Sequence, residues 1–317
     1  MKYVFLLSLT LLIPLKSISQ GCSDAGFCTM GAMKPDQPYS KKIAVRLQSA
    51  ELSFYRGTTT LTPIIYVATA DLNFSIKRKN TFQLKLPFQA ITGRLANTQG
   101  MGDISLCFTR NIYSSDKFSL NLSFGGKIPT NHSDKATDTG LPLPMYYQTS
   151  LGTYDVISGI SLINRKWLLA TGIQVPLNSN KNQFVWTSWA GVEPGLRAYA
   201  DRYNQAKELK RGTDIMLRIE RNFRFSKLNL TVGILPIYRI TKDEFVRSGS
   251  EANSPQTRIS PDAAKGLACS LLMTTGYNFN VRSGVRLLLG HKIVQRETNP
   301  DGLTREFVSS LTYVYRF

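Results

Sequence analysis

The chain has 317 residues, with 39 Lys and Arg against 21 Asp and Glu, so its formal charge is +18. Its 16 Phe, 14 Tyr and 42% apolar content exclude a disordered chain, and four Cys in so long a chain exclude a small disulfide scaffold. A helical membrane protein would need runs of about twenty apolar residues, and the one candidate run, at the N-terminus, is too short. One large domain or two ordinary ones remain.

Residues 1–19 predict a secretory signal peptide. Lys2 gives the positively charged start, residues 4–15 (VFLLSLTLLIPL) form the apolar core, and the small residues Ser17 and Ser19 stand two apart before the cleavage point. Cleavage removes two Lys and no acid, which leaves a charge of +16. We therefore expect an exported protein.

Residues 20–41 follow the signal and are rich in Gly, Ser, Pro and Met. We expect either a flexible periplasmic leader or a plug-like segment that folds into a larger structure. Because export permits disulfides, Cys22 and Cys28 could close a small loop. Cys107 and Cys269 lie in apolar segments and are expected to pack as small hydrophobic residues. The cysteine spacing matches no metal site, and neither a metal nor a cofactor is predicted.

The body of the chain alternates apolar and polar residues with a period of two, which is typical of β-strands. The pattern continues for over ten residues in 116–128 and returns in 81–90 and 281–293. A soluble sandwich also alternates, but its strands usually have five or six residues. Longer strands in an exported protein predict a transmembrane barrel with the apolar face toward lipid, closed because an open edge would leave backbone groups unpaired in hydrocarbon. In the first segment the apolar face comprises Phe118, Leu120, Leu122, Phe124 and Ile128.

The predicted fold is all-β: an antiparallel up-and-down barrel over residues 42–317 with about twelve strands. Short and long connections alternate, and the even number places both termini in the periplasm of an outer-membrane protein. Residues 182–200 could hide another hairpin and raise the count to fourteen, or 196–210 could form a short surface helix. The twelve expected strands are 42–55, 60–77, 80–93, 100–113, 116–129, 151–163, 165–178, 209–222, 226–240, 263–279, 281–294 and 304–317.

The C-terminus carries the sharpest single pattern. Leu311, Tyr313, Tyr315 and Phe317 share one face of the last strand, and Phe is the final residue. Outer-membrane barrels end in a similar strand, which the assembly machinery recognises by adding it at a sheet edge. Tyr313, Tyr315 and Phe317 are therefore the predicted assembly signal.

The basic residues are scattered rather than grouped in a nucleic-acid motif, so nucleic acid is not an expected partner. The expected partners are outer-membrane lipid, the assembly machinery and a small solute. A lumen rich in Lys and Arg would favour anions, whereas paired charges would plug it, and both alternatives stay open. Asp103, Asp155, Asp214 and Glu220 are candidate counter-charges. The predicted lumen-lining residues are Lys85, Asp103, Lys117, Lys127, Asp155, Arg218, Glu220, Arg282, Arg286 and Lys292.

Catalysis has little support in the sequence, and an enzyme is not predicted. His132 falls in a predicted outer loop with Asp134 and Asp138 nearby, and His291 has the lipid-facing parity. A barrel hydrolase would need His beside Ser or Asp on neighbouring strands. Such a hydrolase, acting through His132, is the third functional hypothesis.

Three short motifs occur in order: residues 100–103 (GMGD) open a strand, 127–130 (KIPT) end the next one, and 148–155 (QTSLGTYD) follow a loop. This order resembles the outer-membrane barrel family associated with the meta-pathway of phenol degradation, over about residues 80–180. Asn131 stands where that family usually has Gly. The motif residues are Gly100, Gly102, Asp103, Pro129, Gly152 and Asp155.

The resemblance implies a transporter-like barrel for aromatic or other small hydrophobic compounds. We therefore expect a passive channel or uptake port for a small solute. The alternative is a non-conducting barrel that presents loops 130–150, 179–208 and 241–262 to partners.

Overall fold

The computed structural model describes residues 30–34, 46–58, 63–76, 79–303 and 305–317. The predicted signal peptide and the Cys22–Cys28 pair lie outside the described residues. Within the described residues, no helix is both long and apolar enough to cross a bilayer.

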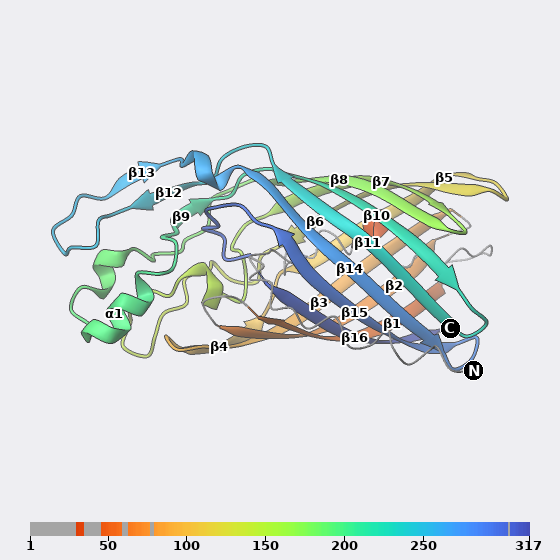
Figure 1. Cartoon of the computed structure of the whole chain (residues 1–317), viewed down its shortest axis with the longest axis horizontal. Coiled ribbons are helices and arrows are strands. Elements are labelled where there is room, and N and C mark those ends of the chain that lie inside the picture. The colour runs from red at the N-terminus through yellow and green to blue at the C-terminus, as the bar shows by residue number, and fades with distance from the viewer. Residues whose placement is uncertain (1–29, 35–45, 59–62, 77–78, 304) are drawn as a thin grey trace, which may run out of the picture.

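Twelve long antiparallel strands form a closed barrel, as predicted (Figure 1). Each strand pairs with its sequence neighbours, and β1 closes the barrel on β16, with Leu52 opposite Tyr313. The strands are β1 Arg46–Thr58, β2 Ile64–Ile76, β3 Asn80–Thr92, β5 Ile104–Ser114, β6 Phe118–Ile128, β7 Asp155–Asn164, β8 Trp167–Pro176, β10 Asp214–Arg224, β11 Leu228–Arg239, β14 Gly266–Asn278, β15 Ser283–Val294 and β16 Phe307–Arg316.

The alternation in sequence becomes an alternation in burial. On β6, Ser119, Asn121 and Ser123 are buried, whereas Leu122 and Phe124 are exposed, the latter at 61%. Exposed apolar side chains therefore cover the outside of the barrel, and polar ones line the inside. A face of this kind is stable only against lipid, because exposure of so large an apolar area to water is unfavourable.

The last strand follows the same rule. Val308, Thr312 and Val314 point inward and are buried, while Tyr313 and Phe317 are exposed on the outside. The Phe317 amide donates to the carbonyl of Gln48, so the end of the chain is held against β1. Recognition of this strand by an assembly machinery stays a prediction.

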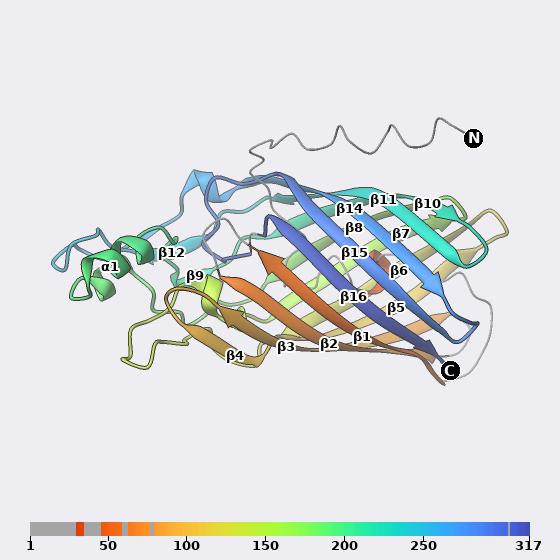
Figure 2. The same cartoon turned by 60° about the horizontal axis from the view of Figure 1, so that its bottom comes forward.

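Short turns and long loops gather at opposite ends of the barrel (Figure 2). Outer-membrane barrels have short periplasmic turns and long outer loops. The end with the turns, where β16 finishes, is therefore the periplasmic end, and the other end faces outward.

The outer loops carry their own structure (Figure 1). Residues 182–200 contain a 3-10 helix and α1 instead of a barrel hairpin, so the fourteen-strand alternative is wrong. The helix α1 begins with Pro at its first turn and Glu193 as N-cap. It ends at Ala200, before the predicted limit of 210. The outer elements are β4 Asn97–Met101, η3 Met145–Tyr147, η4 Trp186–Trp189, α1 Pro194–Ala200, β9 Lys207–Lys210, β12 Glu244–Arg247, β13 Thr257–Ile259 and η5 Asp262–Ala264.

Candidate functional site in the lumen

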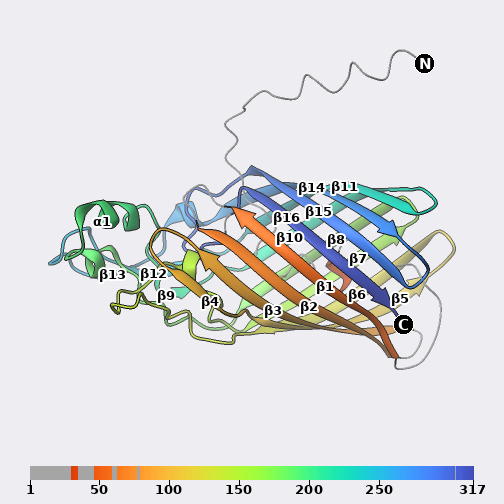
Figure 3. The ribbon, with the colours of Figure 1, turned by 90° about the horizontal axis from the view of Figure 1, so that it is seen from below.

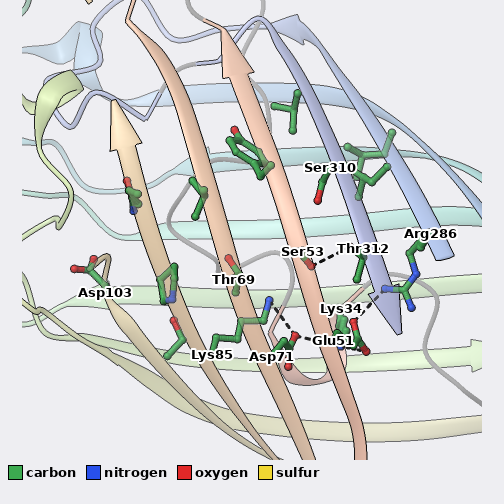
Figure 4. Close-up of a pocket in the computed structure, with 18 of the residues that line it drawn as sticks. Lys34, Glu51, Ser53, Thr69, Asp71, Lys85, Asp103, Arg286, Ser310 and Thr312 are labelled. Carbon is green, nitrogen blue, oxygen red and sulfur yellow. Dashed lines mark hydrogen bonds and ion pairs between the residues drawn. The ribbon is translucent and has the colours of Figure 1, made fainter. Parts of the chain in front are cut away.

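A cavity of about 170 Å³ lies inside the barrel. Its wall comes mainly from the adjacent strands β3, β2, β1, β16 and β15, whose inward side chains face it (Figure 4). The lining combines apolar and polar side chains, and the part nearer the periplasmic end carries charge. The apolar lining residues are Tyr55, Val67, Pro87, Leu272, Leu288 and Val308, and the neutral polar ones are Ser53, Thr69, Gln89, Ser105, Ser310 and Thr312.

Five charged side chains line the part of this cavity nearer the periplasmic end. We call them the mid-lumen charge cluster: Lys34, Glu51, Asp71, Lys85 and Arg286. The Nζ atom of Lys34 lies 2.7 Å from Glu51 and 3.3 Å from Asp71. Lys85 reaches Asp71 at 3.7 Å, and Arg286 reaches Glu51 at 3.5 Å. Three cations face two carboxylates, so most of the charge is neutralised and a single positive excess remains.

Lys34 belongs to a short segment, Met30–Lys34, that sits inside the barrel and contains η2 (Gly31–Met33). We call this segment the plug. Met30 and Met33 are fully buried. The Gly31 amide donates to Gln83 Oε1 at 2.8 Å, and Arg218 Nη1 donates to the Met33 carbonyl at 3.4 Å. The plug is therefore fixed from the β3 side and from the β10 side of the lumen.

Gly31 allows the plug to lie against the wall. Its φ is +49°, a left-handed conformation that glycine adopts without strain. A Cβ at this position would lie 2.3 Å from Cys107 Sγ and 2.6 Å from Ser123 Oγ. Any larger residue would have to push the plug away from β5 and β6.

The three sequence motifs meet at the outer end of β5 and β6. Asp103 forms a buried ion pair with Lys127 at 3.2 Å and accepts hydrogen bonds from the Ser150 hydroxyl and the Leu151 amide. Thr130 Oγ1 donates to the Met101 carbonyl at 2.7 Å. The motifs therefore tie a long outer loop down onto the barrel rim, and Pro129, which lacks an amide hydrogen, ends β6 beside them.

The glycines of these motifs allow close approaches. Gly102 donates its amide to the Pro87 carbonyl at 2.8 Å, and a Cβ there would lie 2.6 Å from Gln89 Nε2. Gly152 has φ +70°, and a Cβ on it would lie 2.8 Å from the His132 carbonyl oxygen. Gly100 lies on β4 above them, with a Cβ position 3.2 Å from Thr149 Oγ1.

A second network of buried charges fills the lumen nearer the outer end. We call it the outer charge cluster: Asp155, Arg211, Asp214, Arg239, Asp243 and Asp301. Arg239 contacts Asp214, Asp243 and Asp301 at 2.7, 2.7 and 2.8 Å. Arg211 adds a 2.9 Å contact to Asp155. All of these side chains are buried. Removing one member of such a network leaves a buried charge without its partner, which is costly in a low-dielectric interior.

Asp301 lies in the loop between β15 and β16 and shows the effect of the network on ionisation. Burial alone would raise the pKa of Asp301, but the guanidinium groups of Arg239, Arg296 and Arg211 outweigh it and hold the pKa well below its usual range. For Asp243, in contrast, burial and the neighbouring Asp301 raise the pKa against the pull of Arg239. Asp301 is therefore ionised at neutral pH and attracts its arginine partners by charge.

An aromatic cluster, which we call the aromatic lid, packs against the outer side of the cavity. Its core is Tyr203, whose ring lies 5.1 Å from that of Tyr146, 5.8 Å from Tyr147 and 5.7 Å from Tyr199, all at steep angles. Tyr55 packs against this lid and also lines the cavity. The remaining members are Phe184 and Trp189. The cavity thus meets the aromatic lid at Tyr55 on its outer side and the ion pairs of the mid-lumen charge cluster on its periplasmic side.

The structure separates the predicted lumen-lining residues into two groups. Eight lie on the inner wall and are largely buried: Lys85, Asp103, Lys127, Asp155, Arg218, Glu220, Arg286 and Lys292. Lys117 and Arg282 do not lie there, and their prediction was wrong. Both are exposed in turns, because β6 begins at Phe118 and β15 at Ser283, and the period of two does not extend beyond the strand.

Several residues of the site were missed. Glu51 and Asp71 share the inward parity of their strands with Ser53 and Asn73, so the period of two could have identified them. Lys34 lies outside any strand and could not have been found this way. The same holds for the loop members of the outer charge cluster, Arg211, Asp243 and Asp301.

The two histidines lie apart from the cavity. His132 is exposed in an outer loop, as are Asp134 and Asp138, and His291 is exposed on the lipid-facing side of β15. Within the described residues, no group of three or more His, Cys, Asp or Glu is placed to hold a metal ion.

A solved outer-membrane channel from Pseudomonas putida F1 has a similar fold: it is 12% identical, covers 89% of this chain and 99% of its own, and gives a TM-score of 0.58. Two more distant barrels are the monoaromatic hydrocarbon channel CymD (9% identity, TM-score 0.41, 95% of each chain) and outer membrane phospholipase A from Escherichia coli (7%, 0.40, 92% and 98%). No family model and no curated protein matches the sequence. The first likeness shows the fold.

The closed barrel, its apolar outer face and this likeness define an outer-membrane β-barrel protein. Within that class, the lumen holds a cavity, a plug, two charge clusters and an aromatic lid.

Proposed function

We propose that the protein is a passive channel or uptake port for small solutes, with the cavity as the solute-holding part of its path. The single observation that carries the proposal is this cavity of about 170 Å³ in the lumen of a closed barrel. A barrel built only for structure would fill its centre with side chains, as small barrels do. The fold of an outer-membrane channel from Pseudomonas putida F1 supports the same assignment.

The lining suggests the kind of solute. Six apolar and six neutral polar side chains share the cavity with the charge cluster, Asp103 and Arg218. An apolar protein cavity of about 150 Å³ accommodates a benzene molecule, so a single-ring aromatic compound with one polar group fits the size and the mixed lining. The resemblance of the GMGD, KIPT and QTSLGTYD motifs to the phenol meta-pathway barrels points to the same class.

Passage requires the plug to move, because Met30 and Met33 are buried in the lumen and Lys34 is held by two carboxylates. The barrel with the plug in place is therefore the low-conductance state. Lys34 lines the cavity as a member of the mid-lumen charge cluster, so its ion pairs hold the plug next to the solute path.

Planar-bilayer recordings in potassium chloride test the proposal. We expect Gly31→Ala to raise the ionic conductance several-fold over wild type, because the added Cβ collides with Cys107 Sγ and displaces the plug. Gly140→Ala is the matched control: Gly140 also has a positive φ, +82°, but no heavy atom lies within 4 Å of its Cβ position. Phenol should then block the Gly31→Ala current in a concentration-dependent way, and glycerol should not. A Gly31→Ala barrel that passes no current would remove the channel assignment.

The alternative is a non-conducting barrel that presents its outer loops to partners. The buried outer charge cluster and the folded loop elements favour it, since both fill the outer end. The same recordings separate the two functions, because a non-conducting barrel stays closed in both glycine variants.

A further inference from the structure

The five periplasmic turns carry exposed basic residues that the channel function does not use. We call these residues the basic collar: Lys79, Lys117, Arg165, Lys166, Lys227 and Arg282, all exposed. Among the described residues of these turns, Asp116 is the only acid. Two of the collar residues, Lys117 and Arg282, are those that the sequence had assigned to the lumen.

The outer end distributes its charge differently. Three of its exposed bases lie beside acids: Lys242 is 2.5 Å from Asp262, Arg258 is 3.4 Å from Glu208 and Lys210 is 3.9 Å from Glu244. Charges of both signs therefore mix on the outer loops. The excess of positive charge on the collar belongs to one end of the barrel only.

Arginines on the strand ends extend this charge toward the lipid. Arg110 is exposed on the outward parity of β5, next to Phe108 and Ile112. Arg221 also lies on the outward parity, with its guanidinium carbon 4.8 Å from the centre of the Trp167 ring. Aromatic side chains of this kind lie at the level of the lipid headgroups. The cations are therefore placed where headgroups meet the barrel wall.

We propose that the basic collar binds the headgroups of anionic phospholipids in the inner leaflet of the membrane. Each Lys or Arg near an anionic surface contributes attraction that salt screens. The lipid-facing position of Arg110 and Arg221 favours a lipid partner over a soluble acidic macromolecule, because such a partner could not reach side chains on the barrel wall.

Native mass spectrometry of the full-length protein, titrated with phosphatidylglycerol and with phosphatidylethanolamine, tests this inference. We expect wild type to bind phosphatidylglycerol at least tenfold more tightly than phosphatidylethanolamine. The triple variant Lys117→Gln, Lys166→Gln, Lys227→Gln should lose most of this preference, roughly tenfold in affinity. The matched control Lys181→Gln, Lys210→Gln, Lys265→Gln removes three exposed outer cations and should change the affinity less than twofold.

A second measurement needs no variant. Raising the salt from 0.15 to 1 M should weaken phosphatidylglycerol binding to wild type and leave phosphatidylethanolamine binding unchanged, since only the first depends on charge. Equal binding of the two lipids by wild type, or an equal loss in the collar and outer variants, would overturn the inference. Either result would overturn the inference even if the collar were then found to bind an acidic protein.

Discussion

Two arginines at opposite ends of the barrel show how differently the ends treat charge. Arg239, at the outer end, is buried and touches three carboxylates. Arg224, at the periplasmic end of β10, is exposed. At the outer end, where α1, β9, β12 and β13 lie (Figure 3), charged side chains form buried ion pairs, whereas at the periplasmic end they lie on the surface. The same residue type therefore contributes to stability at one end and to surface properties at the other.

Removal of the buried Arg239 charge should have the largest effect on the stability of the protein. Arg239→Met leaves Asp214, Asp243 and Asp301 without their shared partner, and we expect a loss of about 3–5 kcal/mol in unfolding free energy. Urea unfolding in lipid vesicles, followed by tryptophan fluorescence, measures it. The control Arg224→Met should change the free energy by less than about 0.5 kcal/mol. Similar losses in both variants would contradict the difference between the ends.

A medium effect is expected where the motifs hold the outer loop. Gly152→Ala adds a Cβ that lies 2.8 Å from the His132 carbonyl and strains a backbone with φ +70°. We expect a loss of about 1–3 kcal/mol, measured in the same unfolding experiment. Gly140→Ala, with φ +82° and open space around it, separates backbone strain from the clash. If it costs as much as Gly152→Ala, the close approach is not the cause.

The smallest effect concerns pH. Because the pKa of Asp301 is lower in the folded protein than in the unfolded chain, its contribution to stability is complete above the ordinary carboxyl value of about 3.9 and is lost as the pH falls through the lower folded value. We expect Asp301→Asn to flatten the acid side of a plot of melting temperature against pH below about pH 4. Asp138→Asn, which changes an exposed loop carboxylate, should leave the slope as in wild type. The raised pKa of Asp243 acts in the opposite direction, so a steeper slope in Asp301→Asn would show that Asp243 dominates.

The sequence predicts the barrel wall closely, because a strand between lipid and a polar lumen must alternate. Residues 80–93 and 281–294 were predicted as strands, and the structure has Asn80–Thr92 and Ser283–Val294. The same rule correctly gives an inward position for Lys85 and Arg286. It fails at Lys117 and Arg282, because a turn has no defined inner face.

The contents of the lumen are harder to predict. Lys34 reaches Glu51 and Asp71 from a segment without periodicity, and two of the partners of Arg239, Asp243 and Asp301, come from loops, the latter 62 residues away. Such contacts depend on how loops fold back over the barrel, and single-sequence patterns do not report this. The composition of residues 20–41 is compatible with a plug-like segment and with a flexible leader, and it does not distinguish between the two.

The ionic current through a barrel whose plug can be locked shows whether solutes pass through the plugged lumen. In Gly31→Cys the new Cβ falls next to the native Cys107 thiol, 2.3 Å away before relaxation, so mild oxidation should join the plug to β5. With the bond confirmed by mass spectrometry, we predict that the oxidised protein conducts no more than wild type and that reduction raises the current at least several-fold. Equal currents in the oxidised and reduced protein would contradict a solute path that runs through the plugged lumen.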